Sequence, residues 1–267
     1  MKTTDEKRQT FRELHRTGCF VIPNPWDVGS ARYLQSLGFK AIATTSAGYA
    51  WSQGHSDNHV TLDDMLRHFE TMAAALDVPV NADFEGGFAV DPAGVAANVR
   101  RAAATGVAGV SIEDSTGHPA VPLHEFSLAV ERMHAAAEAL RGSGVLLVGR
   151  SEGFISGRPD IDETIRRLKA YADAGADCLY APGITTREQI AAVVRAVAPK
   201  PVNVLVRGPV TTLAELESLG VRRISTGGAL ARTAWTGLIA AAEEMARKGT
   251  FEALGAATKA DVNALFG

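Results

Sequence analysis

Cysteine is scarce in this sequence. Only two of the 267 residues are cysteines, Cys19 and Cys178, and they do not form the CxxC spacing of redox and zinc sites. A disulfide framework is therefore excluded as the basis of the fold, and both thiols are expected to be free in a reducing compartment.

Long apolar runs are missing as well. No run is long enough to span a bilayer, and the opening residues, MKTTDEKRQT, lack the apolar core of a secretory signal. The formal net charge at pH 7 is only -3, so no electrostatic attraction to nucleic acid or to a membrane surface is indicated. We expect a cytoplasmic protein that binds neither nucleic acid nor membrane.

Short apolar runs alternate with helical patterns along the whole chain. The runs are continuously apolar, as strands buried on both faces of a parallel sheet are. They are FVIPNPWD (20–27), AIATTSAGYA (41–50), PVNADF (79–84), GVSIED (109–114), VLLVGRSE (145–152), CLYAPG (178–183), PVNVLV (201–206) and RRISTGG (222–228). Glycine ends most of the helical segments just before the next run, as a left-handed cap does.

Eight strand-helix repeats predict an α/β fold, a TIM (β/α)8 barrel formed by residues 1–267 as one domain. We expect an extra N-terminal helix within residues 1–17, a C-terminal helix within residues 250–267, and a loop over residues 51–60. A doubly wound open sheet is the alternative. It would usually carry GxGxxG after its first strand, and PNPWDVGSA is not such a motif.

Carboxylates close two of the apolar runs. Asp83 and Glu85 end one run, and Glu113 and Asp114 end the next. A carboxylate at the end of a buried strand is costly unless something pairs with it, and oxygen clusters of this kind suit a hard divalent cation. Acids that pair with Lys or Arg, or that cap the next helix, explain the pattern equally well. Active sites of barrels lie at the carboxyl ends of the strands, where Arg150 would face these acids.

Several of these segments together resemble the isocitrate lyase / phosphoenolpyruvate mutase superfamily. NADFEGGF (81–88) stands where that family has its DxDxG(Y/F)G metal motif, GVSIED (109–114) matches its strand ending in Glu-Asp, and GRSEGF (149–154) matches its A-R-T-[DE] strand. The resemblance covers nearly the whole chain. It implies a TIM barrel whose last helix, here the segment after Gly249, is swapped between subunits of a homo-oligomer built from dimers.

The resemblance also implies a cofactor and a set of site residues. Members bind Mg2+, for which Mn2+ is an alternative, and a small anionic 2-oxo or 2-hydroxy acid. By this resemblance Asp83 would contact the metal directly, Glu113 would hold a metal-bound water, and Asn81 stands where many members have a second Asp. Arg150 would pair with the substrate carboxylate, the backbone N–H groups of Thr45, Ser46 and Ala47 would stabilise an enolate oxygen, and Asp57 matches an acid near the reacting end. The residues themselves add three candidates with open alternatives. Glu85 is a further metal ligand or an exposed loop acid, Ser46 contributes its hydroxyl or only its amide, and Asn203 contacts the substrate or ties the backbone.

Three departures from the family pattern bear on the chemistry. Lyases of the family carry a Lys-Lys-Cys-Gly-His loop, whereas STGHPAVPLHEF (115–126) contains neither Lys nor Cys. His118 is then the candidate proton donor of this loop, with a solvated loop histidine as the alternative. Asn81 replaces an Asp and should weaken metal binding, which Glu85 could compensate. Pro182 stands where the lyases place a Glu.

These observations predict a Mg2+-dependent lyase that cleaves a C–C bond in a small 2-hydroxy or 2-oxo acid through an enolate. Two alternatives stay open. One is a C–P bond enzyme, either a phosphonopyruvate hydrolase or a mutase, which Asp57 favours. The other is a barrel that binds 2-oxo acids without catalysis, which Asn81 and the changed loop favour.

Overall fold

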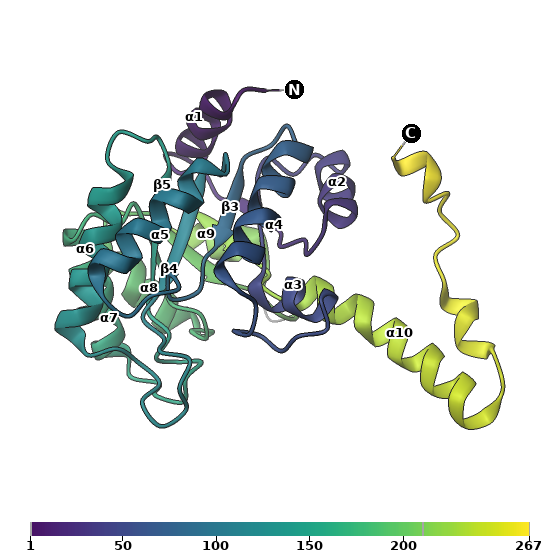
Figure 1. The fold of residues 1–267 in the computed structure, drawn as a ribbon. Helices are drawn as coiled ribbons and strands as arrows, with labels where there is room; N and C mark the ends of the chain where they lie inside the picture. Colours follow the sequence, from purple (N-terminus) through teal and green to yellow (C-terminus); the bar gives the residue numbers. More distant parts are fainter. Residues whose placement is uncertain (1, 210, 267) are drawn as a thin grey trace.

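Eight parallel strands form the centre of the molecule in this computed structural model, which describes residues 2–209 and 211–266 (Figure 1). The strands are β1 (Phe20–Ile22), β2 (Ile42–Ala43), β3 (Val80–Asp83), β4 (Gly109–Glu113), β5 (Leu146–Arg150), β6 (Cys178–Tyr180), β7 (Val202–Leu205) and β8 (Arg223–Ser225). Their hydrogen-bonded order is β1-β8-β7-β6-β5-β4-β3-β2. The predicted TIM barrel is confirmed.

The seam between β1 and β2 is joined by contacts at the end of β2 and in the segments that follow the two strands. The Ala43 N–H donates to the Pro23 carbonyl at 3.0 Å, and the Asn24 side-chain amide donates to the Thr44 carbonyl at 2.8 Å. These bonds draw the sheet into a nearly closed barrel, so that the carboxyl ends of all eight strands surround one mouth.

Helices surround the strands (Figure 1). They are α1 (Thr4–Leu14), α2 (Val28–Ser36), α3 (Ser46–Ser52), α4 (Leu62–Ala75), α5 (Pro92–Ala104), α6 (Phe126–Leu140), α7 (Ile161–Asp173), α8 (Arg187–Val197), α9 (Leu213–Ser218) and α10 (Ala229–Lys248). Most begin at a Thr or Asp whose side chain accepts a bond from a first-turn N–H, such as Thr61 and Asp160. Across the described part of the chain, no helix is both long enough and apolar enough to cross a membrane.

The N-terminal helix closes the end of the barrel opposite the mouth. Phe11 of α1 is fully buried and belongs to a cluster with Ile22, Ala108 and Leu146 from the strand region. The helix that was expected within residues 1–17 is thus observed as α1. Its apolar side seals the amino end of the barrel interior, which leaves the carboxyl end as the open one.

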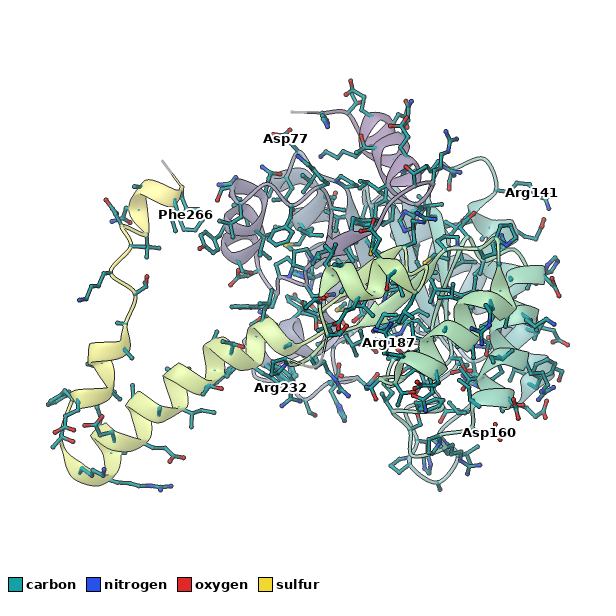
Figure 2. All side chains as sticks on the ribbon, turned by 180° about the vertical axis from the view of Figure 1, so that it is seen from behind. Asp77, Arg141, Asp160, Arg187, Arg232 and Phe266 are labelled. Atoms are coloured by element: carbon teal, nitrogen blue, oxygen red, sulfur yellow. The ribbon has the colours of Figure 1, made fainter. Side chains whose placement is uncertain are left out.

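The prediction of a C-terminal helix within residues 250–267 is wrong. Helix α10 ends at Gly249, whose φ of +66° is left-handed, and two short 3-10 segments follow, η1 (Glu252–Ala256) and η2 (Asn263–Leu265). A short, exposed segment does not bury enough surface to stabilise a helix. Helix α10 projects away from the barrel (Figure 1), and Figure 2 shows its side chains standing clear of the strands. Swapping of this region between subunits stays a prediction.

Helix α3 was also not anticipated from the sequence. Its residues fall at the end of an apolar run and the start of the predicted loop, and the small side chains of TTSAGYA gave no helical periodicity. The Thr45 side chain accepts a bond from the Gly48 N–H at 3.3 Å and starts the helix. This helix of seven residues, about two turns, brings Ser46 to the mouth of the barrel.

Candidate active site

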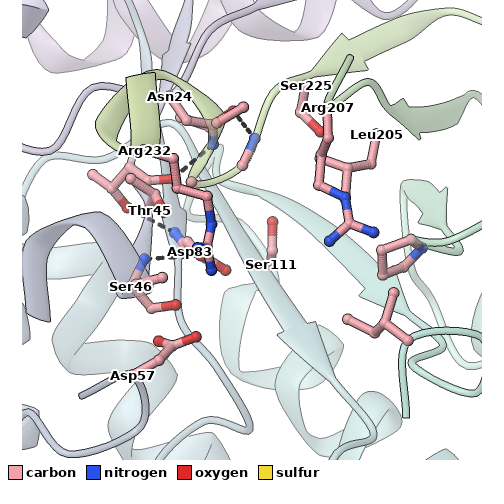
Figure 3. Close-up of a pocket in the computed structure, with 18 of the residues that line it drawn as sticks. Asn24, Thr45, Ser46, Asp57, Asp83, Ser111, Leu205, Arg207, Ser225 and Arg232 are labelled. Carbon is pink, nitrogen blue, oxygen red and sulfur yellow. Dashed lines mark hydrogen bonds between the residues drawn. The ribbon is translucent and has the colours of Figure 1, made fainter. Parts of the chain in front are cut away.

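A pocket of about 380 Å³ opens at the carboxyl ends of the strands (Figure 3). Residues from all eight strands or the loops that follow them line it, and most are polar. The chemistry-bearing ones are Asn24, Thr45, Ser46, Asp57, Asn81, Asp83, Ser111, Arg150, Tyr180, Arg207, Arg223, Ser225 and Arg232. The sequence-predicted Thr45, Ser46, Ala47, Asp57, Asn81, Asp83 and Arg150 are therefore brought together at one site.

Asp83 lies at the centre of the polar wall. One of its oxygens accepts a bond from the Ser46 backbone N–H at 3.0 Å, and the other accepts from Arg150 Nη1 at 2.6 Å. The Ser46 N–H is the one expected to stabilise an enolate oxygen, and here it is used by Asp83. The carboxylate is thus held between the start of α3 and the end of β5.

Arg150 is the cation of this wall. Strand register places it directly beside Glu113, and its Nη2 lies 3.1 Å from a Glu113 oxygen and 2.9 Å from a Glu152 oxygen. Its guanidinium also lies 5.0 Å from the centre of the Tyr180 ring. One buried guanidinium therefore neutralises part of the charge of three carboxylates, Asp83 included.

Two glutamates beside Arg150 have raised pKa values. Burial, followed by the charges of Asp83 and Asp57, raises the pKa of Glu85 to about 8. Burial also raises the pKa of Glu113 well above its usual range, against the opposing effect of Arg150. Both glutamates therefore hold a proton more readily than a solvated carboxyl group does, and a cation bound beside them would favour their ionised forms.

This donor set fits a hard divalent cation in its chemistry. Asp83, Glu85 and Glu113 supply carboxyl oxygens, the ligands that hard divalent cations prefer. Within residues 2–209 and 211–266, however, no three His, Cys, Asp or Glu side chains already form a metal-holding group. Arg150 lies among these carboxylates and already supplies one positive charge to them.

Asp57 approaches the pocket from the loop after α3 (Figure 3). Its pKa is raised, first by desolvation at the pocket edge and then by the charge of Asp83, while a hydrogen bond from the Ser46 side chain opposes the shift. Asp57, Ser46 and Asp83 thus form a connected group at the pocket edge, and the role of Asp57 at the reacting end stays a prediction.

Asn81 and Asn203 belong to a deeper layer. Asn81 lines the floor of the pocket, where its amide donates to Ser111 Oγ at 2.8 Å and its carbonyl oxygen accepts from Arg223 Nη1 at 3.3 Å. Asn203 is fully buried, accepts from Arg223 Nε at 2.8 Å and donates to Ser225 Oγ at 2.9 Å. Both amides are already bonded to Arg223 and to a serine, and their roles as metal ligand and substrate contact stay predictions.

His118 lies apart from the pocket. It is exposed on the loop after β4, and its Nδ1 accepts a bond from the Ala120 N–H of the same loop at 3.2 Å. It lines a neighbouring hollow with Glu85 and Glu113. The structure therefore does not bring His118 together with Arg150 and Asp57.

Sequence reasoning missed three arginines of the pocket, Arg207, Arg223 and Arg232. Arg207 follows β7, and Arg232 lies on the first turn of α10 with its guanidinium 4.6 Å from the Trp51 ring. Arg223 had a signal, since a charged residue inside the apolar run of β8 is unusual. Arg232 had none, because helical periodicity does not reveal that the start of α10 edges the mouth.

Comparisons with known proteins agree with this geometry. A family model described as phosphoenolpyruvate phosphomutase matches residues 11–246. An oxaloacetate decarboxylase from Paraburkholderia xenovorans (strain LB400) is 30% identical over 237 residues, which are 85% of this chain and 76% of that protein.

Solved structures give the same result. A protein of Burkholderia cenocepacia J2315 described as a lyase or mutase has a TM-score of 0.93 at 48% identity, covering 99% of this chain and 96% of its own. Oxaloacetate acetylhydrolase in complex with oxalate has a TM-score of 0.86 at 26% identity, covering 99% and 95%. The resemblance seen in the motifs is confirmed: the chain belongs to the isocitrate lyase / phosphoenolpyruvate mutase superfamily, enzymes that act as lyases and mutases on small carboxylic acids.

Proposed function

We propose that this protein is a Mg2+-dependent lyase that cleaves a C–C bond in a small 2-oxo or 2-hydroxy carboxylic acid through an enolate. One observation carries the proposal. Asp83, Glu85 and Glu113 gather beside Arg150 at the carboxyl ends of β3, β4 and β5, where burial raises the pKa values of Glu85 and Glu113 and a bound cation would favour their ionised forms. The neighbouring pocket has room for a small acid.

Asp83, Glu85 and Glu113 are the residues that would hold the cation. When bound, Mg2+ would supply Lewis-acid stabilisation for negative charge that develops on a carbonyl oxygen. With these carboxylates engaged, the planar fork of Arg150 would be available to the carboxylate of the substrate, to which it can donate two parallel bonds.

The start of α3 would serve the reacting carbonyl. The backbone N–H groups of Thr45 and Ala47, and that of Ser46 once Asp83 turns from it to the cation, would donate to the enolate oxygen as fixed dipoles. Asp57, bonded by the Ser46 side chain, would act at the bond that breaks. Its raised pKa is that of a group suited to proton transfer.

C–P chemistry on a phosphonopyruvate-like acid is the second candidate. Asp57 favours this chemistry because it matches an acid that family members use near the reacting end. Arg207 and Arg232 at the rim add positive charge to which a phosphonate would bind. Figure 3 places Arg207 on the opposite side of the pocket from Asp57.

Turnover of a panel of acids tests the proposal. Oxaloacetate, 2-methylisocitrate, 2,3-dimethylmalate and phosphonopyruvate would each be incubated with the protein in Mg2+ or in EDTA, and products identified by NMR. Cleavage of a C–C substrate only in Mg2+ is expected. Turnover of phosphonopyruvate alone would favour the C–P candidate. Binding of acids without turnover of any would leave only a non-catalytic binding protein.

A further inference from the structure

The interior of this barrel is polar along four of its strands. Interiors of TIM barrels are ordinarily packed with branched apolar side chains, and β5 and β6 contribute the apolar Val148 and Cys178. The strands on either side of this pair are different. Strands β3, β4, β7 and β8 contribute Asn81, Ser111, Asn203, Arg223 and Ser225, all of them buried.

Arg223 is the charged member of this group. Only 2% of its surface is exposed, yet it lines the floor of the pocket. Its Nε donates to Asn203 Oδ1 at 2.8 Å and its Nη1 to Asn81 Oδ1 at 3.3 Å. Both partners are neutral amides, and among the described residues no carboxylate forms an ion pair with it.

The two buried arginines of the pocket thus differ in their charge balance. Arg150 is bonded to three carboxylates, whereas Arg223 keeps its positive charge against neutral oxygens. A buried guanidinium without a counterion is costly. An anion that reaches the pocket floor would offset that cost, and planar guanidinium groups bind carboxylates with favourable geometry.

The spacing fits two anionic groups on one small molecule. Asn81 and Asp83 lie two residues apart on β3, a rise of roughly 6.6 Å. Arg223 bonds at the level of Asn81, and Arg150 bonds at the level of Asp83. The floor and the upper wall are therefore separated by about the length of a short-chain diacid.

We propose that Arg223, held by Asn81 and Asn203, forms a second anion-binding site at the pocket floor that takes the distal carboxylate of the substrate. Arg223 would then determine specificity for acids with two carboxylates over acids with one. This inference rests on the proposed function for the identity of the acid, but it concerns binding and can be measured without turnover.

Two variants test the floor site. Arg223→Met removes the cation. Asn203→Asp puts a carboxylate on the atom that accepts the Arg223 Nε bond, which neutralises the cation while keeping the contact. Affinities for pyruvate and for 3,3-difluorooxaloacetate, which adds a second carboxylate, would be measured calorimetrically in Mg2+. Arg222→Met is the matched control, because Arg222 is adjacent in sequence and does not line the pocket.

The readout is the ratio of the two affinities. We expect the wild-type protein and Arg222→Met to prefer the diacid, and both test variants to lose at least tenfold of that preference. Asn203→Asp should lose this preference with an unchanged or raised Tm. This variant therefore still tests the floor site if Arg223→Met does not fold. A purely structural arginine would leave the ratio unchanged in Asn203→Asp, and that result would overturn the floor site.

The outcome also separates this inference from the proposed function. If the protein turns over no acid but the ratio of diacid to monoacid affinity depends on Arg223, the floor site is supported and the proposed lyase activity is refuted. If the protein cleaves a C–C substrate but this affinity ratio is the same with and without Arg223, the lyase is supported and the floor site is refuted.

Discussion

Arg150 connects more of the site than any other residue described in the pocket wall. Its side chain is 13% exposed and is bonded to carboxylates from β3, β4 and the segment after β5. Nη1 bonds Asp83, Nη2 lies beside both Glu113 and Glu152, and Nε also donates to Glu152 at 3.0 Å. The compact ammonium group of a lysine does not offer this planar arrangement of donors.

We therefore predict that Arg150→Lys weakens pyruvate binding in Mg2+ about tenfold, because an ammonium group cannot make two parallel bonds to a carboxylate. Calorimetry measures the affinity. Arg166→Lys is the control, since Arg166 pairs with Glu163 on an exposed helix face away from the pocket. Unaltered affinity in Arg150→Lys would count against its assigned role.

Asp57 and His118 give a second prediction at this scale. Asp57 lines the pocket and is bonded by Ser46, while His118 is exposed and bonded within its own loop. Asp57→Asn should lower kcat on the preferred acid about a hundredfold, a typical contribution of a positioned acid or base. His118→Gln should change kcat by less than about threefold. The reverse ranking would restore the histidine as the proton donor.

At the scale of elements, helix α1 seals the barrel through a buried histidine. The His15 Nδ1–H donates to the Phe11 carbonyl at 2.7 Å, and its ring packs edge-on against Phe11 and Phe20. Burial, with the charge of Arg223 as the next cause, lowers the pKa of His15 from its ordinary value of 6.5 to about 3. The folded protein therefore keeps this ring neutral.

The consequence for stability has a definite sign. Below pH 6.5 the unfolded chain protonates His15 while the folded protein does not, so stability is lost as the pH falls from about 6.5 toward 3. One proton corresponds to a slope of about 1.4 kcal/mol per pH unit. Urea unfolding of wild type and His15→Asn between pH 7 and 4.5 should differ in slope by that amount. Parallel pH profiles would contradict the neutral buried ring.

The elements also show what the sequence could reveal. Continuous apolar runs predicted all eight strands, because strands buried on both faces leave that pattern regardless of detail. Asp83, Glu113 and Arg150 could be placed at one mouth because parallel strands end on one side. Helix α3 could not be predicted, since a short run of small residues depends on its Thr45 cap and on tertiary contacts. The bonding of Arg223 to Asn81 and Asn203 joins strands far apart in the chain, which no local pattern encodes.

At the scale of the whole molecule, α10 leaves a long apolar face uncovered. Leu238 and Ile239 are 56% and 50% exposed, and Trp235 and Met245 are also exposed on this helix. Apolar side chains that cluster in this way commonly mark a protein interface. Figure 1 shows the helix extending beyond the barrel, where its own chain offers little to cover it.

We predict that the protein is a homo-oligomer through this helix. Leu238→Asp should shift the mass measured by light scattering after size-exclusion chromatography to that of one chain, because a charge on an apolar interface is costly to bury. Ala240→Asp adds the same charge two residues along, on a different face of the helix, and should leave the mass unchanged. A wild-type protein that is already a monomer would refute the prediction.

The account depends most on the acidic strand ends holding a cation at the mouth of the barrel. Titration calorimetry of Mg2+ into wild type and Asp83→Ala, each with pyruvate present and with folding checked by circular dichroism, measures this directly. We predict that the wild-type protein binds Mg2+ and that Asp83→Ala, still folded, shows no measurable binding. Equal Mg2+ affinity in the two proteins, or no binding by either, would contradict the central claim.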